Sequence, residues 1–162
     1  MKHSLSGLRK NNMRKNEAFI FDLDGTIADC EHRRHWIAAK PKNWRAFFAG
    51  IPNDPVIEWV ATIARRTFER GEIDVVIVTA RDETCRDNTV NWLKDNGIRY
   101  DAIYFRPDKD YRDDTLVKHE IYQKVKADGF KPVLVFDDRP KVVRMWKEQG
   151  LVVVDCGAGV EF

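Results

Sequence analysis

An apolar segment that ends in two aspartates constrains this chain more than any other feature of its sequence. Residues 18–22 read Ala-Phe-Ile-Phe-Asp, and Leu23, Asp24, Gly25 and Thr26 follow. The apolar residues are typical of a buried strand, whereas two carboxylates at its tip repel each other and must be desolvated or paired. The string therefore predicts either a reactive pair of carboxylates or a structural turn, and the rest of the chain decides between them.

The length and composition are those of one globular domain. The chain has 162 residues, of which 43% are hydrophobic and 33% charged, so it can bury a sizeable core. Its net charge is only +2, but residues 1–16 contain five Lys or Arg residues and no acid. We interpret this stretch as a flexible basic tail, either a plain solvated terminus or an aid to binding an anionic partner. Residues 17–162 are then a single domain.

Nothing in the sequence indicates export or a membrane partner. The basic start of the chain is not followed by the apolar segment of a signal peptide, and the longest aliphatic runs, such as Val75–Val78, are too short to span a bilayer. Cys30, Cys85 and Cys156 are odd in number and widely spaced, so they suggest no disulfide framework. We expect a protein of the reducing cytoplasm.

Apolar segments and helical patterns alternate along the chain. The apolar segments cover about residues 18–22, 73–79, 101–105, 132–137 and 151–155. The helical patterns, bounded by Asp or Pro at the start and Gly at the end, cover about residues 55–71, 82–97, 113–128 and 140–149. Strands that alternate with helices predict an α/β fold with a doubly wound, Rossmann-like parallel sheet.

Residues 31–72, which follow the first predicted strand, are predicted to form a small helical, cap-like insertion. Asp54-Pro55 would place Pro at the first position of its last helix, and Gly71 would end that helix. The insertion holds eight Lys or Arg residues against five acids, a balance that suits a phosphate backbone. We expect its aromatic residues to pack mainly as its core, with base stacking as the alternative: Trp36, Trp44, Phe47, Phe48, Trp59 and Phe68.

Polar residues follow three of the predicted strands where they end. The first strand leads to Asp22 and Asp24, the second to Thr79-Ala80-Arg81, and a later one to Asp137-Asp138. The carboxyl ends of parallel strands share one edge of the sheet, where ligands bind in such folds. Clustered carboxylates need a cation among them, and oxygen ligands favour Mg²⁺ over zinc. The sequence therefore predicts a magnesium site at this edge.

The Asp22-Leu-Asp24-Gly-Thr string, Thr79, Lys118 and Asp137-Asp138 resemble the four ordered motifs of the haloacid dehalogenase-like (HAD) hydrolases. The resemblance implies a phosphatase in which Asp22 attacks phosphorus and forms an aspartyl-phosphate. Asp24 would protonate the leaving oxygen and then activate water. Thr79 would hydrogen-bond a phosphoryl oxygen, and Lys118 would neutralise the phosphate and the attacking carboxylate.

The same resemblance implies the ligands of the metal. Mg²⁺ would be held by the carboxylate of Asp22, the backbone carbonyl of Asp24 and Asp137, and it would shield the charge between nucleophile and phosphate. Asp138 would be a further ligand or would support the others.

A narrower resemblance covers residues 113–121 and 136–147, which are similar to the 3′-phosphatase domain of bacteriophage polynucleotide kinase–phosphatase. This resemblance implies that Thr26, Arg33, Arg81 and Asp114 bind phosphate or substrate. The chain has no G-x-x-x-x-G-K-[ST] motif for a kinase, so we expect a phosphatase alone.

The function that these resemblances imply is a Mg²⁺-dependent polynucleotide 3′-phosphatase that repairs DNA or RNA ends. Two alternatives stay open at this point, a nucleotidase or small-metabolite phosphatase and an inactive nucleic-acid-binding module. The implied partners are phosphorylated 3′ ends of nucleic acids, or nucleotides, and the sequence leaves open a separate kinase or ligase partner. The choice between DNA and RNA and the oligomeric state are open as well.

Overall fold

The computed structural model describes residues 16–157. The predicted basic tail, residues 1–16, lies outside the described residues except for Asn16. Among the described residues, no helix combines the length and the apolar character that a membrane span requires.

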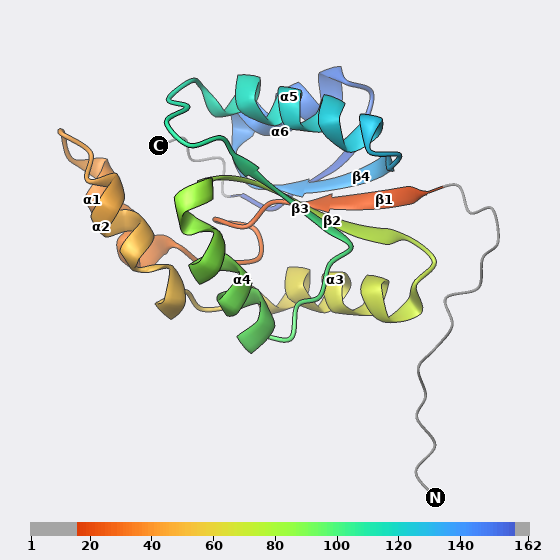
Figure 1. Ribbon diagram of the computed structural model, residues 1–162, viewed down its shortest axis with the longest axis horizontal. Helices are drawn as coiled ribbons and strands as arrows, with labels where there is room; N and C mark the ends of the chain where they lie inside the picture. The colour runs from red at the N-terminus through yellow and green to blue at the C-terminus, as the bar shows by residue number, and fades with distance from the viewer. Residues whose placement is uncertain (1–15, 158–162) are drawn as a thin grey trace, which may run out of the picture.

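A five-stranded parallel sheet forms the centre of the molecule, in the order β3-β2-β1-β4-β5. The strands are β1 (Glu17–Phe21), β2 (Asp74–Asp82), β3 (Ala102–Arg106), β4 (Lys131–Asp137) and β5 (Val152–Asp155). The order reverses at β1, which pairs with β2 on one side and β4 on the other (Figure 1). The predicted α/β fold with a doubly wound parallel sheet is confirmed.

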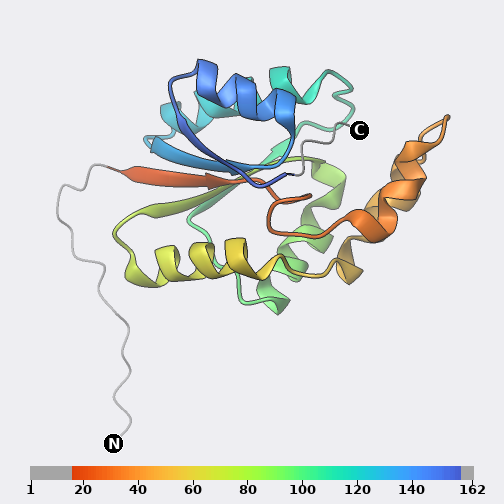
Figure 2. The ribbon, with the colours of Figure 1, turned by 180° about the vertical axis from the view of Figure 1, so that it is seen from behind.

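Two layers of helices cover the sheet. The helices α3 (Glu58–Arg70) and α4 (Arg86–Asp95) lie on one face, and α5 (Asp114–Ala127) and α6 (Pro140–Glu148) lie on the other (Figures 1 and 2). Successive strand residues point to opposite faces, so Phe21 packs with the α3–α4 layer and Ile20 with the α5–α6 layer. The apolar strands are covered on both faces, as parallel strands require.

Two short helices, α1 (Glu31–Ala38) and α2 (Trp44–Ala49), lie beyond the carboxyl ends of the strands (Figure 1). They share a small core of Cys30, Ile37 and Phe47, with Phe48 packed against it. A turn of 3-10 helix (Ile51–Asn53) leads from α2 towards α3. The predicted insertion, residues 31–72, thus contains two helices that lie apart from the sheet and one, α3, that packs on it.

The prediction that the aromatic residues of this segment form a core is wrong for its three tryptophans. Trp36, Trp44 and Trp59 are 43%, 45% and 50% exposed, whereas Phe47 is buried. The helices α1 and α2, of eight and six residues, bury only the face that they share, so Trp36 and Trp44 stay partly in solvent. Trp59 lies on α3 instead, whose buried residues are Val60, Ala61 and Ala64.

The start of α3 also differs from the prediction. The helix begins at Glu58, not at Pro55, because residues 55–57 are extended and pair with residues 27–29. The amide of Asp29 donates to the Pro55 carbonyl at 2.8 Å, and the amide of Ile57 donates to the Ile27 carbonyl at 2.8 Å. Gly71 ends the helix in the left-handed conformation, at φ 63°, as predicted.

The core of the α3–α4 layer gives a direct test of this packing. Leu93 of α4 is fully buried, so Leu93→Ala should lower the free energy of unfolding by about 3 kcal/mol because it leaves a cavity. Leu116→Ala is the matched control: its side chain is 56% exposed, and the change should stay within about 0.5 kcal/mol. Urea unfolding followed by circular dichroism measures both. Equal losses in the two variants would contradict the arrangement.

Candidate active site

Three carboxylates meet at the carboxyl ends of β1 and β4. Asp22 follows β1, Asp137 ends β4, and Asp138 comes next in the chain. One oxygen of each lies within 4.8 Å of the others, and all three residues are buried. The pairing of β1 with β4 sets this register, since the amide of Asp22 donates to the Phe136 carbonyl at 3.0 Å. The predicted cluster of acids at this edge therefore exists.

Lys118 of α5 supplies a positive charge to this cluster. Its Nζ donates to Oδ2 of Asp137 at 2.8 Å and lies 3.0 Å from Oδ1 of Asp22. Burial lowers the pKa of Lys118, but Asp137 and Asp22 more than offset it, so the pKa is held above its ordinary value. Trp146 of α6 orients the same carboxylate, because its Nε1 donates to Oδ2 of Asp137 at 3.1 Å.

One ammonium does not balance the three acids. Burial raises the pKa of Asp22 well above its ordinary value, and Asp137 and Asp138 raise it further against the effect of Lys118. Burial, followed by the charge of Asp137, raises the pKa of Asp138 to about 6. A buried set of carboxylate oxygens that is short of positive charge fits a hard divalent cation such as Mg²⁺. Asp22, Asp137 and Asp138 are the side chains that could hold it.

The Gly-Thr part of the first motif fits closely against Asp138. Gly25 has φ 81°, and a Cβ at this position would lie 2.1 Å from Oδ2 of Asp138, so a side chain here would displace the carboxylate. Thr26 is fully buried, and its Oγ1 donates to Oδ1 of Asp138 at 3.4 Å. Thr26 thus contacts Asp138, not the open cavity where a substrate would bind.

Asp24 lies in a second, separate group of charges. Arg81 donates from Nε to Oδ2 of Asp24 at 3.0 Å and from Nη2 to Oδ1 at 2.6 Å, and Arg33 donates from Nη2 to Oδ1. Burial raises the pKa of Asp24, but the charges and hydrogen bonds of Arg81 and Arg33 outweigh it and hold the pKa well below its usual range. Asp24 is therefore ionised in this state of the site.

Asp54 is the residue of this group that the sequence analysis missed. Its fully buried carboxylate accepts from Nε and Nη2 of Arg33, both at 2.7 Å, and from Nη2 of Arg81 at 3.2 Å. His32 Nε2 lies 2.8 Å from Oδ1, and Trp92 donates to the Asp54 carbonyl at 2.9 Å. Arg33 and Arg81 were both predicted to bind phosphate, and Asp24 alone does not balance two buried arginines. That imbalance indicated a further carboxylate, but the sequence did not show which acid would fold against the arginines.

Arg33 also connects the α1–α2 pair to the site. It is 1% exposed, and its guanidinium lies 4.1 Å from the centroid of the Phe47 ring. A Cβ on Gly50 would come within 3.0 Å of Cδ of Arg33, so the glycine leaves room for the arginine. Arg33, which the family resemblance implies as a phosphate-binding residue, is thus brought beside Asp24.

Asp114 and Thr79 take different positions. Asp114, in the first turn of α5, pairs with both Arg106 and Arg139 and lines the cavity described below. Thr79 is fully buried, and its Oγ1 accepts from the amide of Arg81 at 3.2 Å. Within the described part of the chain, neither Thr79 nor Thr26 is among the residues that line the cavity.

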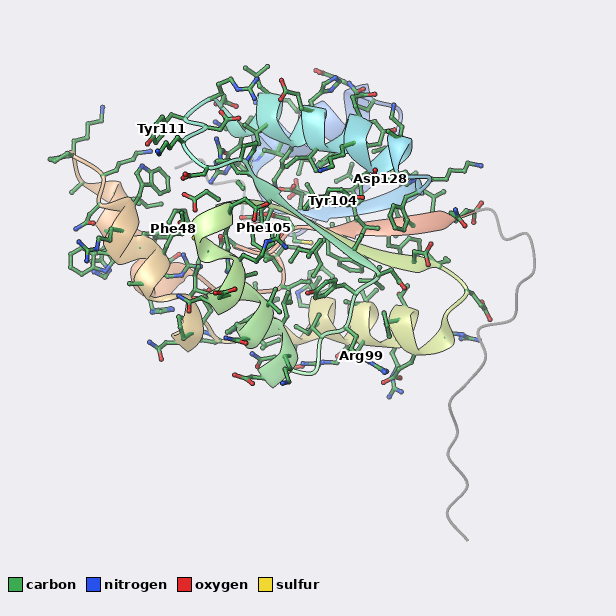
Figure 3. The ribbon with its side chains drawn as sticks, viewed as in Figure 1. Phe48, Arg99, Tyr104, Phe105, Tyr111 and Asp128 are labelled. Carbon is green, nitrogen blue, oxygen red and sulfur yellow. The ribbon has the colours of Figure 1, made fainter. Side chains whose placement is uncertain are left out.

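A cavity of about 270 Å³ opens directly onto these groups. Its floor includes Asp22, Asp24 and Lys118. One wall is formed by α2 and the other by the loop of residues 107–113, which follows β3; Phe48 and Tyr111 mark the two walls in Figure 3. The reactive carboxylates are thus reached through an opening between the short helices and this loop.

Comparison with known proteins identifies the family of the chain. Residues 16–160 match the family described as the polynucleotide kinase PNKP phosphatase domain. The "Putative bifunctional polynucleotide kinase/RNA ligase" of Autographa californica nuclear polyhedrosis virus is 28% identical over 132 residues, which are 81% of this chain and 18% of the viral protein.

Two solved structures have similar folds. A chain of the Pnkp1/Rnl/Hen1 complex superposes with a TM-score of 0.76 at 26% identity, over 90% of this chain and 47% of the other. The class C acid phosphatase of Bacillus anthracis has a TM-score of 0.60 at 17% identity, over 77% of this chain and 53% of the other, which shows the shared fold alone. This chain spans a fifth or less of the viral relative and about half of the Pnkp1/Rnl/Hen1 chain.

Asp54 provides a test of the second charge group. Asp54→Asn removes a buried negative charge that pairs with Arg33 and Arg81, so the free energy of unfolding should fall by about 3 kcal/mol. Glu58→Gln breaks an exposed pair with Arg65 and should cost less than about 1 kcal/mol. Urea unfolding at neutral pH compares them. A loss for Asp54→Asn no greater than that for Glu58→Gln would show that Asp54 does not hold the arginines.

Proposed function

Since the chain belongs to the family of the polynucleotide kinase PNKP phosphatase domain, we propose that it removes the 3′-phosphate from the ends of DNA or RNA in nucleic-acid end repair. The observation that carries the proposal is the placement of Asp22, within the cluster of acids and beside Lys118, on the floor of an open cavity. A carboxylate there can reach phosphorus, while the remainder of a long substrate stays outside.

In the first step, an oxygen of Asp22 attacks phosphorus, the bond from phosphorus to the 3′ oxygen breaks, and an aspartyl-phosphate forms. Lys118, within 3.0 Å of Asp22, offsets the charge that collects between the carboxylate and the phosphate. Mg²⁺ held by Asp22, Asp137 and Asp138 would shield the same charge when bound. In the second step, water attacks the intermediate, which releases phosphate and restores Asp22.

We propose that Asp24 transfers the proton in both steps and that Arg33 and Arg81 control its protonation state. In the free site, Arg33 and Arg81 keep it ionised. An incoming phosphate offers these arginines another anion, and as they turn to it the pKa of Asp24 rises towards that of a usable acid. Asp24 then takes up a proton from solvent, gives it to the leaving 3′ oxygen, and in the second step takes one from the attacking water.

The remaining site residues support these steps. Arg33 and Arg81 would bind phosphoryl oxygens bidentately. Asp114 would hold Arg106 and Arg139 at the edge of the cavity, and Thr26 would orient Asp138. Thr79, predicted to bind phosphate, would act by holding the backbone amide of Arg81 with its hydroxyl oxygen. The carbonyl of Asp24 stays the fourth proposed ligand of the metal.

The relatives bear on substrate and partners. One is named as a polynucleotide kinase and RNA ligase, and the other belongs to a Pnkp1/Rnl/Hen1 complex. We propose that this chain likewise acts on phosphorylated 3′ ends in the cytoplasm, beside a kinase or a ligase that is a separate protein or a further part of a longer one.

A substrate panel tests the function. With Mg²⁺, the protein should release phosphate from a 3′-phosphorylated oligonucleotide faster than from 3′- or 5′-nucleoside monophosphates, measured as kcat/KM. Asp22→Asn should lower the rate by at least about three orders of magnitude, since it removes the nucleophile. Asp95→Asn changes an exposed Asp on α4 in the same way and should not affect the rate. Preference for free nucleotides would instead favour the nucleotidase alternative.

Metal removal tests the proposed cation. Dialysis against EDTA should abolish phosphate release, and added Mg²⁺ should restore it, because the carboxylate cluster lacks enough positive charge without a cation. Isothermal titration should detect Mg²⁺ binding that Asp138→Asn weakens. Full activity after EDTA treatment, with no Mg²⁺ binding, would contradict a metal-dependent reaction.

A further inference from the structure

Tyr111 projects into solvent from a loop whose backbone is held firmly. Nη1 of Arg106 donates to the carbonyl of Asp110 at 2.9 Å and to the carbonyl of Arg112 at 2.8 Å, on both sides of the tyrosine. The guanidinium of Arg112 pairs in turn with Asp110 at 2.7 Å and with Glu120 at 2.6 Å. The Tyr111 side chain is nevertheless 89% exposed. An exposed ring on a fixed loop is typical of a binding residue, since little entropy is lost when a partner stacks on it.

A second aromatic group lies across the cavity. Trp44 and Phe48 of α2 have ring centroids 5.9 Å apart with an angle of 27° between the planes, and Phe47 supports Trp44 edge-on at 5.9 Å. Trp44 is 45% exposed, and the ammonium of Lys42 lies 5.4 Å from its centroid. Both Trp44 and Phe48 line the cavity that Tyr111 lines from the other side. Phe48 and Tyr111 are labelled in Figure 3.

The size and charge of the cavity indicate what these rings bind. Its volume, about 270 Å³, is near the lower end of small-ligand pockets, roughly 300 Å³, which suits one nucleotide and not a duplex. Among the described residues that line it, six Lys or Arg side chains face seven Asp side chains, so the cavity is no strongly positive groove. Attraction for phosphates alone is therefore weak there, and the rings must supply much of the affinity.

We propose that the base of the 3′-terminal nucleotide stacks on Trp44 and Tyr111 while its 3′-phosphate reaches Asp22, so that the protein takes an unpaired strand end. This inference rests on the proposed function and specifies its substrate. A paired terminal base is stacked inside its duplex and cannot enter between the two walls. Stacking is also tolerant of sequence, because every base has a π-face, so all four terminal bases are accepted.

The test uses the full chain with Mg²⁺ and three ends, each as DNA and as RNA: an unpaired 3′-phosphorylated terminal nucleotide, the same end lacking its base, and a blunt duplex. Wild-type kcat/KM should be about 5- to 150-fold higher for the end with a base than for the end without it, the range expected for stacking one base. The blunt duplex should react more slowly than the unpaired end. DNA and RNA should give similar ratios, since a ring stacks on either.

Variants assign this preference to the two rings. Trp44→Ala and Tyr111→Ala should each raise the KM for the end with a base and reduce its advantage over the end without one, with kcat nearly constant. Trp44→Phe and Tyr111→Phe keep an aromatic face and should retain most of the advantage. Trp59→Ala, which removes an exposed tryptophan of α3 away from the cavity, is the control and should behave as wild type. Tyr111 is so exposed that its replacement leaves the fold intact even if Trp44→Ala weakens α2.

The outcomes separate this inference from the function on which it rests. If the wild type dephosphorylates 3′ ends with and without a base equally well, or if both alanine variants lose activity on the two ends in parallel, stacking is wrong and the phosphatase assignment stands. If the wild type acts on no 3′-phosphorylated oligonucleotide, the proposed function fails, and the stacking inference fails with it.

Discussion

The balance of buried charge at the carboxyl edge of the sheet is the constraint on which the rest of the structure depends. The parallel strands bring Asp22, Asp24 and Asp137 to one place, and such acids are stable there only beside cations. Lys118 from α5 and the arginines 33 and 81 supply part of this positive charge, each from a different segment. Because Arg33 belongs to α1, the same balance fixes the α1–α2 pair over the site and forms one wall of the cavity.

The fold and the acid cluster could be predicted because both follow from local pattern and a general rule. Apolar strands that alternate with helices specify a parallel sheet, and in a parallel sheet all carboxyl ends share one edge. Residues that follow strands, such as Asp22 and Asp137, could therefore be placed together without knowing any side-chain contact. Lys118 lies on α5 and does not follow a strand, so only the resemblance to the family motif connected it to the cluster.

The other features of the site could not be predicted, because they depend on contacts that the sequence pattern does not reveal. The sequence predicted that Asp54 precedes a helix, since Asp-Pro is common at helix starts. In the structure, residues 55–57 pair with residues 27–29, and this pairing directs the Asp54 carboxylate towards Arg33. Thr26 is next to the reactive aspartates in sequence, yet the turn buries it against Asp138. The exposure of Trp44 likewise follows from how much surface two short helices share, which no periodicity in either one reveals.

The first motif can now be explained residue by residue. Leu23 is fully buried, and its carbonyl accepts the amides of Thr26, Ile27 and Ala28 at 3.0, 3.0 and 2.9 Å, so it anchors the turn of residues 23–28 that carries Asp24. Asp22 lies beside other acids that outnumber the one nearby cation, Lys118, whereas Asp24 lies beside two arginines. In the proposed function, a phosphate that enters between them would bind the arginines on one side, while Lys118 and a bound metal would shield the charge of Asp22 on the other. In the proposed reaction, one intervening residue separates the attacking carboxylate from the proton-transferring one.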